Sequence, residues 1–108
     1  GNANRTNKDD SIETDGLKLF TNRNKVEFND NEIKLTGKEY EILKLLMKNP
    51  DRIYTIEMIY EMVWDEVFTY NAKNTVMVHI KNLRNKLIKA CGDACIHTEW
   101  GRGYRFER

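Results

Sequence analysis

Apolar residues follow two different spacings along this chain. Over residues 17–35, short apolar runs alternate weakly with polar positions, and asparagine-rich segments separate them, which is typical of a short antiparallel meander. The preceding residues 1–16 hold one large apolar residue, Ile12, and this composition predicts a flexible tail. We therefore expect a tail over residues 1–16, followed by one folded domain over residues 17–108.

Three helices are predicted after the meander, because apolar residues there recur at helical spacing. The first begins with a capping box at residues 36–39 (TGKE) and ends before Pro50. The second begins at Thr55, a favourable N-cap residue, and closes at Trp64. The third runs from about residue 71 to residue 89.

A hairpin is predicted after the helices. Two strand-like runs, residues 96–100 and 104–106, flank the turn formed by Gly101, Arg102 and Gly103. A short helix followed by a basic helix matches a helix-turn-helix, and a hairpin beside it would be a wing. The order predicts an α+β fold, a winged helix-turn-helix with an N-terminal antiparallel sheet, a three-helix bundle and a C-terminal β-hairpin wing.

The third predicted helix separates apolar from polar residues around its axis. Its apolar stripe, which must pack on the other helices, consists of Val76, Ile80, Leu83 and Leu87. The opposite face carries Asn74, Val78, Lys81 and Asn85, with Asn82 beside them. One flank holds Thr75 and His79, and the other holds Met77 and Arg84. Every charged side chain of this helix is positive.

This division suits a helix that lies in the major groove of DNA. Asn bonds adenine bidentately and Lys reaches guanine, while Thr, His and Arg on the flanks bond phosphates. An acidic residue there would oppose the phosphate charge. A solvated helix usually mixes both signs of charge, so DNA contact is favoured over a surface helix with incidental lysines.

The charge of the 108-residue chain is +1 overall but unevenly distributed. Residues 1–66 hold ten Lys or Arg and fourteen Asp or Glu, a net charge of −4, whereas residues 67–108 hold eight and three, a net charge of +5. This asymmetry indicates an anionic partner on the C-terminal side. No apolar run is long enough to span a membrane, and two cysteines make no disulfide framework. We therefore expect a cytoplasmic protein without a membrane partner.

Four sequence blocks occur in the order found in one known family. They are LTGKEYEILKLLMKNPDRIYT, VW at residues 63–64, NTVMVHIKNLRNKL and IHTEWGRGYRF. Over residues 17–107 the chain resembles the OmpR/PhoB-type winged-helix domain of two-component response regulators, and within that family the VanR-like branch. The resemblance implies a head-to-tail dimer on direct-repeat DNA sites, with the third helix in the major groove and the wing, residues 96–106, at the adjacent minor groove.

The resemblance also implies further partners. A receiver domain would precede this domain, with residues 1–16 as the interdomain linker, and a sensor histidine kinase would act upstream. The segment from residue 65 to residue 70 matches the family's transactivation loop, which touches RNA polymerase in some members. The implied polymerase-contact residues are Asp65, Glu66, Val67, Phe68, Thr69 and Tyr70.

Matching positions carry the family's DNA contacts onto this chain. The implied base-reading residues are Asn74, Val78, Lys81, Asn82 and Arg84. The implied phosphate and wing contacts are Trp64, Thr75, His79, Thr98, Trp100, Arg102 and Tyr104.

Departures from the family pattern alter the expected specificity. Asn74 and Asn82 stand where arginines are common, Met77 replaces a common Asp, and Trp100 replaces the wing arginine, for which Arg102 is a candidate substitute. Because Asn pairs best with adenine and Arg with guanine, we predict a preference for half-sites rich in A·T pairs.

Other chemistry is less favoured by the sequence. Cys91, Cys95 and His97 are metal-ligand types, but structural zinc usually needs four ligands, so a loop with half-buried thiols is the favoured interpretation. No acid–base pair, nucleophile elbow or phosphate loop is present, so we expect neither an enzyme nor a cofactor. Trp64 and at least one aromatic residue of the loop that follows it are expected to pack partly inside. The alternative function is a winged-helix protein–protein interaction module with an acidic partner.

Overall fold

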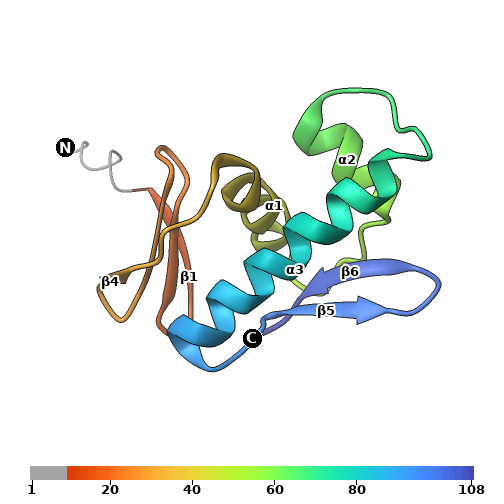
Figure 1. The fold of residues 1–108 in the computed structure, drawn as a ribbon. Coiled ribbons are helices and arrows are strands. Elements are labelled where there is room, and N and C mark those ends of the chain that lie inside the picture. Colours follow the sequence, from red (N-terminus) through yellow and green to blue (C-terminus); the bar gives the residue numbers. More distant parts are fainter. Residues whose placement is uncertain (1–9) are drawn as a thin grey trace.

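The computed structural model describes residues 10–108 and has the predicted order of elements (Figure 1). The elements are β1 (Ser11–Thr14), β2 (Leu17–Phe20), β3 (Lys25–Phe28), β4 (Asn31–Glu32), α1 (Gly37–Lys48), α2 (Ile56–Trp64), α3 (Ala72–Cys91), β5 (Ile96–Glu99) and β6 (Gly103–Phe106). The predicted fold class, with N-terminal antiparallel strands, three helices and a C-terminal hairpin, is therefore confirmed.

The N-terminal sheet begins earlier than the sequence predicted. Its four strands lie in the order β1-β2-β3-β4 and each pairs antiparallel with the next, with Ile12 opposite Leu19. The predicted boundary at residue 17 is therefore wrong, because β1 occupies residues assigned to the tail. Asp15 and Gly16 both have positive φ angles, 46° and 87°, which suit the tight turn between β1 and β2. The rest of the predicted tail, residues 1–9, lies outside the described residues.

Local capping fixes where the first two helices start. The Thr36 hydroxyl accepts the Glu39 amide at 3.2 Å, and the Glu39 carboxylate accepts the Thr36 amide at 2.9 Å, so the predicted capping box is confirmed. Thr55 caps α2 as predicted, because its hydroxyl accepts the Met58 amide at 3.0 Å. α3 ends at Gly92, whose φ of 75° provides the left-handed C-cap.

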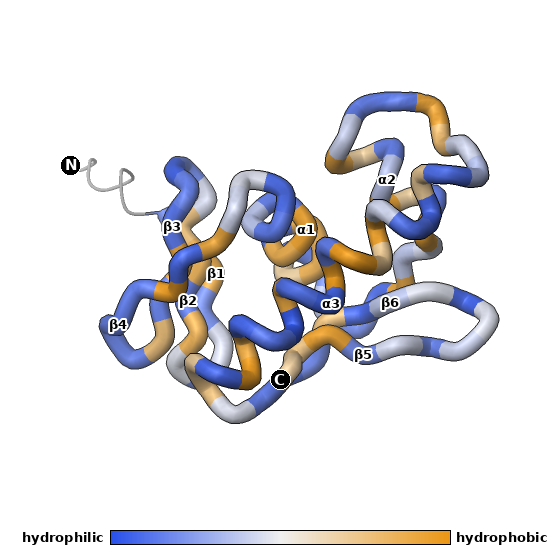
Figure 2. The backbone as a smooth tube through the Cα atoms, viewed as in Figure 1, coloured by the Kyte–Doolittle hydropathy of each residue, from blue (hydrophilic) through white to orange (hydrophobic). Residues whose placement is uncertain are grey.

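The core lies where the three helices meet the sheet and the base of the hairpin. Figure 1 shows α3 crossing the molecule in front of α1, with the sheet at one end and α2 at the other. Along α3, hydrophobic and hydrophilic segments alternate (Figure 2). The predicted apolar stripe is confirmed, since all four of its residues are buried: Val76, Ile80, Leu83 and Leu87.

The hairpin is fastened to the helical part of the domain by its second strand. Tyr54 and Tyr104 exchange two backbone hydrogen bonds, of 2.8 and 2.9 Å, in an antiparallel bridge. Gly103 permits this approach, because a Cβ atom there would lie 2.1 Å from the Tyr54 carbonyl oxygen. Gly103 therefore makes room for a neighbouring backbone, whereas Gly101, with a φ of 77°, serves the predicted turn.

Candidate nucleic-acid interface

The outer face of α3 is exposed and its polar groups are unengaged. The predicted base-reading side chains that lie there are Asn74, Val78, Lys81 and Asn82, all exposed. Within residues 10–108, the three polar members of this set make no side-chain hydrogen bond or ion pair. α3 contains no Asp or Glu over its 20 residues. This face therefore offers free donors and acceptors without a carboxylate that would repel phosphate.

Arg84 differs from the other predicted base-reading residues. Its Nε donates to the Ile96 carbonyl oxygen at 2.9 Å, a terminal nitrogen donates to the Thr98 hydroxyl, and the guanidinium lies over the Tyr104 ring at 5.3 Å. The side chain therefore points to the wing and is half-buried between α3 and the hairpin. A joint between α3 and the wing is thus formed by Arg84, Ile96, Thr98 and Tyr104. Thr98 and Tyr104 were predicted as DNA contacts, and Tyr104 is only 7% exposed.

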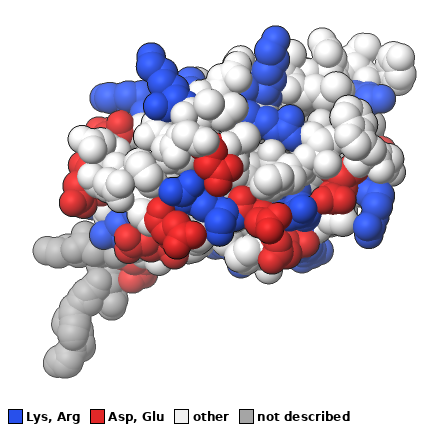
Figure 3. All heavy atoms as spheres, turned by 90° about the horizontal axis from the view of Figure 1, so that it is seen from below, with Lys and Arg blue, Asp and Glu red and all other residues white. Residues whose placement is uncertain are grey.

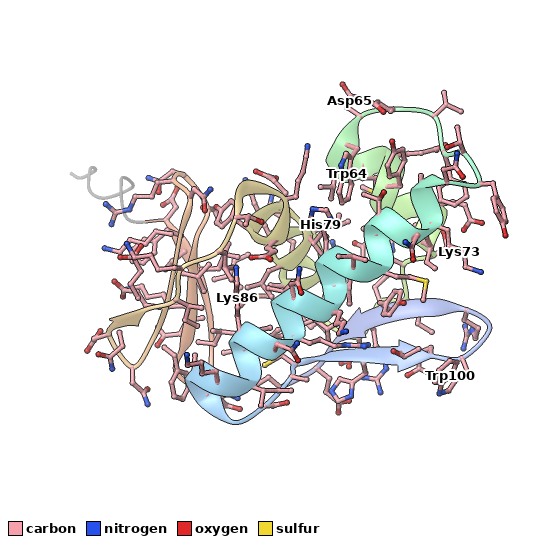
Figure 4. The ribbon with its side chains drawn as sticks, in the orientation of Figure 1. Trp64, Asp65, Lys73, His79, Lys86 and Trp100 are labelled. Carbon is pink, nitrogen blue, oxygen red and sulfur yellow. The ribbon has the colours of Figure 1, made fainter. Side chains whose placement is uncertain are left out.

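The other flank of α3 faces α1 and the end of α2. His79 lies edge-on to Trp64, with ring centroids 5.1 Å apart (Figure 4). Trp64 in turn stacks on Tyr60, with ring centroids 5.3 Å apart. Trp64 is half-buried, as predicted. His79 Nδ1 donates to the Thr75 carbonyl oxygen at 2.7 Å, which leaves Nε2 for a partner.

Lys38 is a cation of this flank that sequence reasoning missed. Its Nζ lies 5.3 Å from the Trp64 ring and 3.3 Å from the Val63 carbonyl oxygen. Together with His79 and Asn82, it lines a hollow of about 520 Å³ between the start of α1 and α3, to which α1 also contributes the acidic residues Glu39 and Glu41. The pattern of the first predicted helix gave no sign of this, because Lys38 lies far from α3 in the sequence and reaches it only through the fold.

An ion pair at the edge of that hollow joins α1 to α3. The Glu39 carboxylate is 2% exposed and accepts a hydrogen bond from Lys86 Nζ at 2.6 Å. Burial raises the pKa of Glu39, but the hydrogen bonds from Lys86 and from the Thr36 amide outweigh it and hold the pKa below its ordinary value. Lys86, one of the cations of the basic helix, is thus paired with Glu39 inside the domain.

The wing ends in an exposed aromatic and an exposed cation. Trp100 is 89% exposed at the tip of the hairpin (Figure 4). Arg102, two residues later, is also exposed. The Arg102 amide donates to the Glu99 carbonyl oxygen at 2.8 Å and closes the turn. The Glu99 carboxylate is held by Arg105 Nε at 2.5 Å, so the nearest acid is neutralised by an ion pair.

Acids and bases are distributed differently on the wing and on α3. Arg105 also pairs with Glu107 at 2.6 Å and with Asp51 at 3.5 Å. Figure 3, which views the molecule from below, shows red and blue atoms alternating across the middle, whereas blue atoms protrude along the upper edge. On the hairpin, Arg105 is thus paired with acids, whereas α3 carries no acid of its own.

The loop between α2 and α3 exposes some of its apolar residues and packs others. Val67 and Tyr70 are 81% and 88% exposed, and Asp65 takes a left-handed backbone with a φ of 57°. Phe68 packs edge-on against Tyr60, with centroids 5.9 Å apart, so the prediction that one aromatic of this loop packs is confirmed. Glu66 and Thr69 are also exposed.

The two thiols lie together, but the nearby histidine turns away from them. His97 Nε2 lies 3.3 Å from the Glu107 carbonyl oxygen, on the far strand of the hairpin. Cys91 is half-buried and Cys95 is buried, which fits the predicted loop with half-buried thiols. In the part of the chain that the structure describes, no three His, Cys, Asp or Glu side chains are grouped to hold a metal ion.

Comparison with known sequences identifies the domain. The family described as "Transcriptional regulatory protein, C terminal" matches residues 30–106. The chain belongs to this family. Its members are the OmpR/PhoB-type DNA-binding domains of response regulators, so the predicted family and the coarse function are confirmed. Among residues 10–108, no helix has the length and apolar content that a membrane crossing requires.

The relatives of this OmpR/PhoB-type domain are bacterial transcription regulators. The chain is 45% identical over 91 residues to the uncharacterized transcriptional regulatory protein YrkP of Bacillus subtilis, covering 83% of this chain and 39% of that protein. It is 38% identical over 100 residues to the transcriptional regulatory protein SrrA of Staphylococcus aureus, covering 91% and 41%. The chain therefore spans about two fifths of these curated relatives. They do not confirm a VanR-like branch, which stays a prediction.

The solved structures agree with the sequence relatives. The DNA-binding domain of CpxR from E. coli has a TM-score of 0.79 and 30% identity, with 90% of this chain and 95% of that chain covered. The DNA-binding domain of RstA from Klebsiella pneumoniae, solved in complex with the RstA box, has a TM-score of 0.78. At 20% identity, the RstA comparison supports the fold alone.

Proposed function

We propose that this domain binds double-stranded DNA in a sequence-specific manner and controls transcription, with α3 in the major groove and the β5–β6 wing at the adjacent minor groove. The observation that carries the proposal is the outer face of α3, where exposed Asn and Lys side chains are free of internal partners and no acid is present. Free polar groups on one rigid helix are what direct readout of base edges needs.

Individual side chains then take separate roles. Asn74, Asn82 and Lys81 bond base edges, and Val78 contacts thymine methyl groups. Thr75, His79, Trp64 and Lys38 bond phosphates of the strand that runs along the α1 side of α3. Trp100 and Arg102 meet the minor groove at the wing tip. Arg84, with Thr98 and Tyr104, holds the wing at a fixed distance from α3, a positioning role in place of base contact.

Membership of the family supports a proposal about the partners. We propose that two copies bind direct-repeat half-sites head to tail, that a receiver domain phosphorylated through a sensor histidine kinase precedes this domain, and that the exposed loop 65–70 touches RNA polymerase. The exposed Val67 and Tyr70 support a protein contact there. We also propose that the protein acts in the bacterial cytoplasm.

A selection experiment tests the proposal. The domain is incubated with a random duplex pool, bound DNA is recovered over several rounds, and the product is sequenced. We expect a short motif rich in A·T pairs, repeated about one helical turn apart. Enrichment of half-sites rich in G·C pairs would contradict the asparagine readout. Retention that is weak, abolished by salt and without any motif would favour the protein–protein alternative with an acidic partner.

Matched variants separate the roles in the same assay. Asn82→Ala should change the enriched motif at one position, whereas Thr75→Ala should lower affinity for every sequence alike and reduce the salt dependence of binding. If both variants keep the wild-type affinity and motif, the named contact surface is wrong.

A further inference from the structure

The two cysteines of the chain flank the short connection between α3 and β5. Cys91 is the last residue of α3, and Cys95 directly precedes β5. The two thiols lie against the same acceptor, the Asp93 carbonyl oxygen, which is 3.5 Å from Cys91 Sγ and 3.4 Å from Cys95 Sγ. Both are free thiols. Because both sulfur atoms contact this one oxygen, the two thiols are neighbours.

The two thiols have different surroundings. Cys91 is half-buried, and an Arg108 guanidinium nitrogen lies 3.7 Å from its sulfur, so a thiolate formed there meets positive charge. Arg108 is itself fixed by Asp93 Oδ2 at 3.3 Å and by the Asp15 carbonyl oxygen at 2.8 Å. Cys91 Sγ also lies 3.1 Å from the Leu87 carbonyl oxygen. Because Cys91 is the less buried of the two, it is the thiol that an external reagent meets.

Cys95 has the environment of a second, internal thiol. It is fully buried, and burial, with the neighbouring Cys91 and Asp93, raises the pKa of Cys95 to about 12. The part of this rise that comes from Cys91, its charge and its hydrogen bond, disappears once the Cys91 sulfur is bonded to another sulfur. Cys95 is thus protected from outside reagents, while its neighbour Cys91 lies within its surroundings.

We propose that Cys91 and Cys95 form a reversible dithiol–disulfide modification site whose reagent is a small-molecule disulfide. The Cys91 thiolate attacks one sulfur of the reagent, breaks its S–S bond and releases one small thiol. The Cys95 thiolate then attacks Cys91 Sγ, forms the Cys91–Cys95 bond and releases the second small thiol. The two protein thiols lose two electrons and two protons in total, and the reagent is reduced to two thiols.

The site lies next to the joint that holds the wing. The Cys95 amide donates to Asp93 Oδ1 at 2.9 Å, and the carbonyl oxygen of the next residue, Ile96, accepts Arg84 Nε at 2.9 Å. Cys95 already has a φ of 65°, a left-handed backbone that is uncommon for residues other than glycine. Drawing its sulfur into a covalent bond with Cys91 shifts the backbone beside the Arg84 contact. Oxidation therefore loosens the wing from α3.

A mass measurement tests the modification without DNA. The 108-residue chain is incubated with oxidised glutathione, alkylated and digested with trypsin, which leaves both cysteines in one peptide, residues 90–102. We expect the wild-type peptide to become lighter by two hydrogens, Cys95→Ser to stop at a glutathione adduct on Cys91, and Cys91→Ser to stay unmodified. A wild-type chain that stays reduced, or that accumulates only the adduct, overturns the proposal.

Hydrogen exchange and DNA affinity test the consequence for the wing. Backbone amides of residues 96–106 should exchange faster in the oxidised chain, recover with a reducing agent, and remain unchanged in treated Cys91→Ser. Unchanged exchange in the oxidised wild type overturns the coupling. The last expectation rests on the proposed function: affinity for the selected duplex should fall about fivefold, as for the loss of one hydrogen bond. Faster exchange with unchanged affinity leaves the modification standing and refutes the role of the wing in DNA binding.

Discussion

The two flanks of α3 are built from similar side chains but leave them in different states. On the wing side, the Arg84 guanidinium donates hydrogen bonds to the Ile96 carbonyl oxygen and the Thr98 hydroxyl, and it lies over the Tyr104 ring. On the α1 side, His79 uses one ring nitrogen within its own helix and keeps the other for a partner, and Lys38 lies nearby. One flank is therefore a structural joint, whereas the other leaves His79 Nε2 and the remaining Lys38 N–H groups unengaged. Residues that look equivalent in a list of DNA contacts differ in whether their donors are free.

The largest expected effect follows from breaking the joint. Arg84→Ala removes two charge-assisted hydrogen bonds and leaves the Ile96 carbonyl oxygen and the Thr98 hydroxyl without this partner. The free energy of unfolding should therefore fall by about 2 kcal/mol. DNA affinity should fall about tenfold because the wing loses its position. Urea unfolding and a DNA titration measure the two changes.

Arg84→Lys is the matched control for this prediction. A lysine keeps the charge but not the fork that bonds Ile96 and Thr98 together, so it should rescue little of either loss. Full recovery of affinity by Arg84→Lys would show that charge toward the phosphates, and not the joint, is what Arg84 provides.

The ion pair on the α1 side should have the next largest effect. Glu39→Gln keeps the shape of the cap but removes the charge that Lys86 meets, and it should lower stability at pH 7 by about 1 kcal/mol, since Lys86 is partly open to solvent. Because the pKa of Glu39 is lowered in the folded state, its contribution is present above the ordinary carboxyl pKa of 4.5 and is lost as pH falls through the folded value.

Unfolding at two pH values isolates this contribution. The difference in stability between wild type and Glu39→Gln should be seen at pH 7 and should vanish in acid, where the carboxyl group is protonated. A difference that persists unchanged in acid would mean that the substitution acts through packing and not through charge.

Removing the side chains of the α1-side flank should affect DNA binding more than stability. Lys38→Ala and His79→Ala should each lower affinity by about fivefold, as expected for one lost phosphate contact, and should keep the selected motif. The slope of log affinity against log salt should become shallower by about 0.9 for Lys38→Ala. A changed motif in either variant would mean that this flank contacts bases instead of phosphates.

The smallest expected effect is at the wing tip. Trp100→Ala should leave the melting temperature unchanged, because the side chain is almost fully exposed. The same substitution should lower DNA affinity by about threefold, because the wing tip loses its contact with the minor groove. Lys18→Ala, on the sheet far from α3 in the sequence, serves as a surface control. In a Trp64→Phe background the fluorescence of Trp100 should shift to shorter wavelength when DNA is added, and an unchanged spectrum would place the tip away from the duplex.

Much of the fold was predictable from local signals. The capping box at Thr36 and Glu39, the N-cap at Thr55 and the apolar stripe of α3 each depend on residues a few positions apart, and the structure has them as predicted. β1 was missed because it holds one large apolar residue, Ile12. Its place is fixed by backbone pairing with β2 and by the turn at Asp15 and Gly16.

The candidate site was predictable only in part, for a physical reason. A helical wheel separates the faces of α3, but it does not show what fills the space beside each flank. Arg84 lies on the same helix as Lys81, yet its hydrogen-bond partner in the wing, Ile96, lies 12 residues later in the sequence. Lys38 and Glu39 approach α3 from α1, 47 residues before Lys86 in the case of Glu39. Long-range contacts of this kind decide which donors remain free.

The most direct test of the account compares side-chain resonances of the two regions in one spectrum. The isotopically labelled domain is titrated with the selected duplex, and the side-chain amides of Asn74 and Asn82 are followed together with the Arg84 Nε–H. We predict large shifts for both asparagine amides and an Arg84 signal that stays in place, because its proton is already donated to Ile96. Shifts of Arg84 with unmoved asparagines would contradict the claim that the outer face of α3 reads DNA while the wing-side flank serves as a joint.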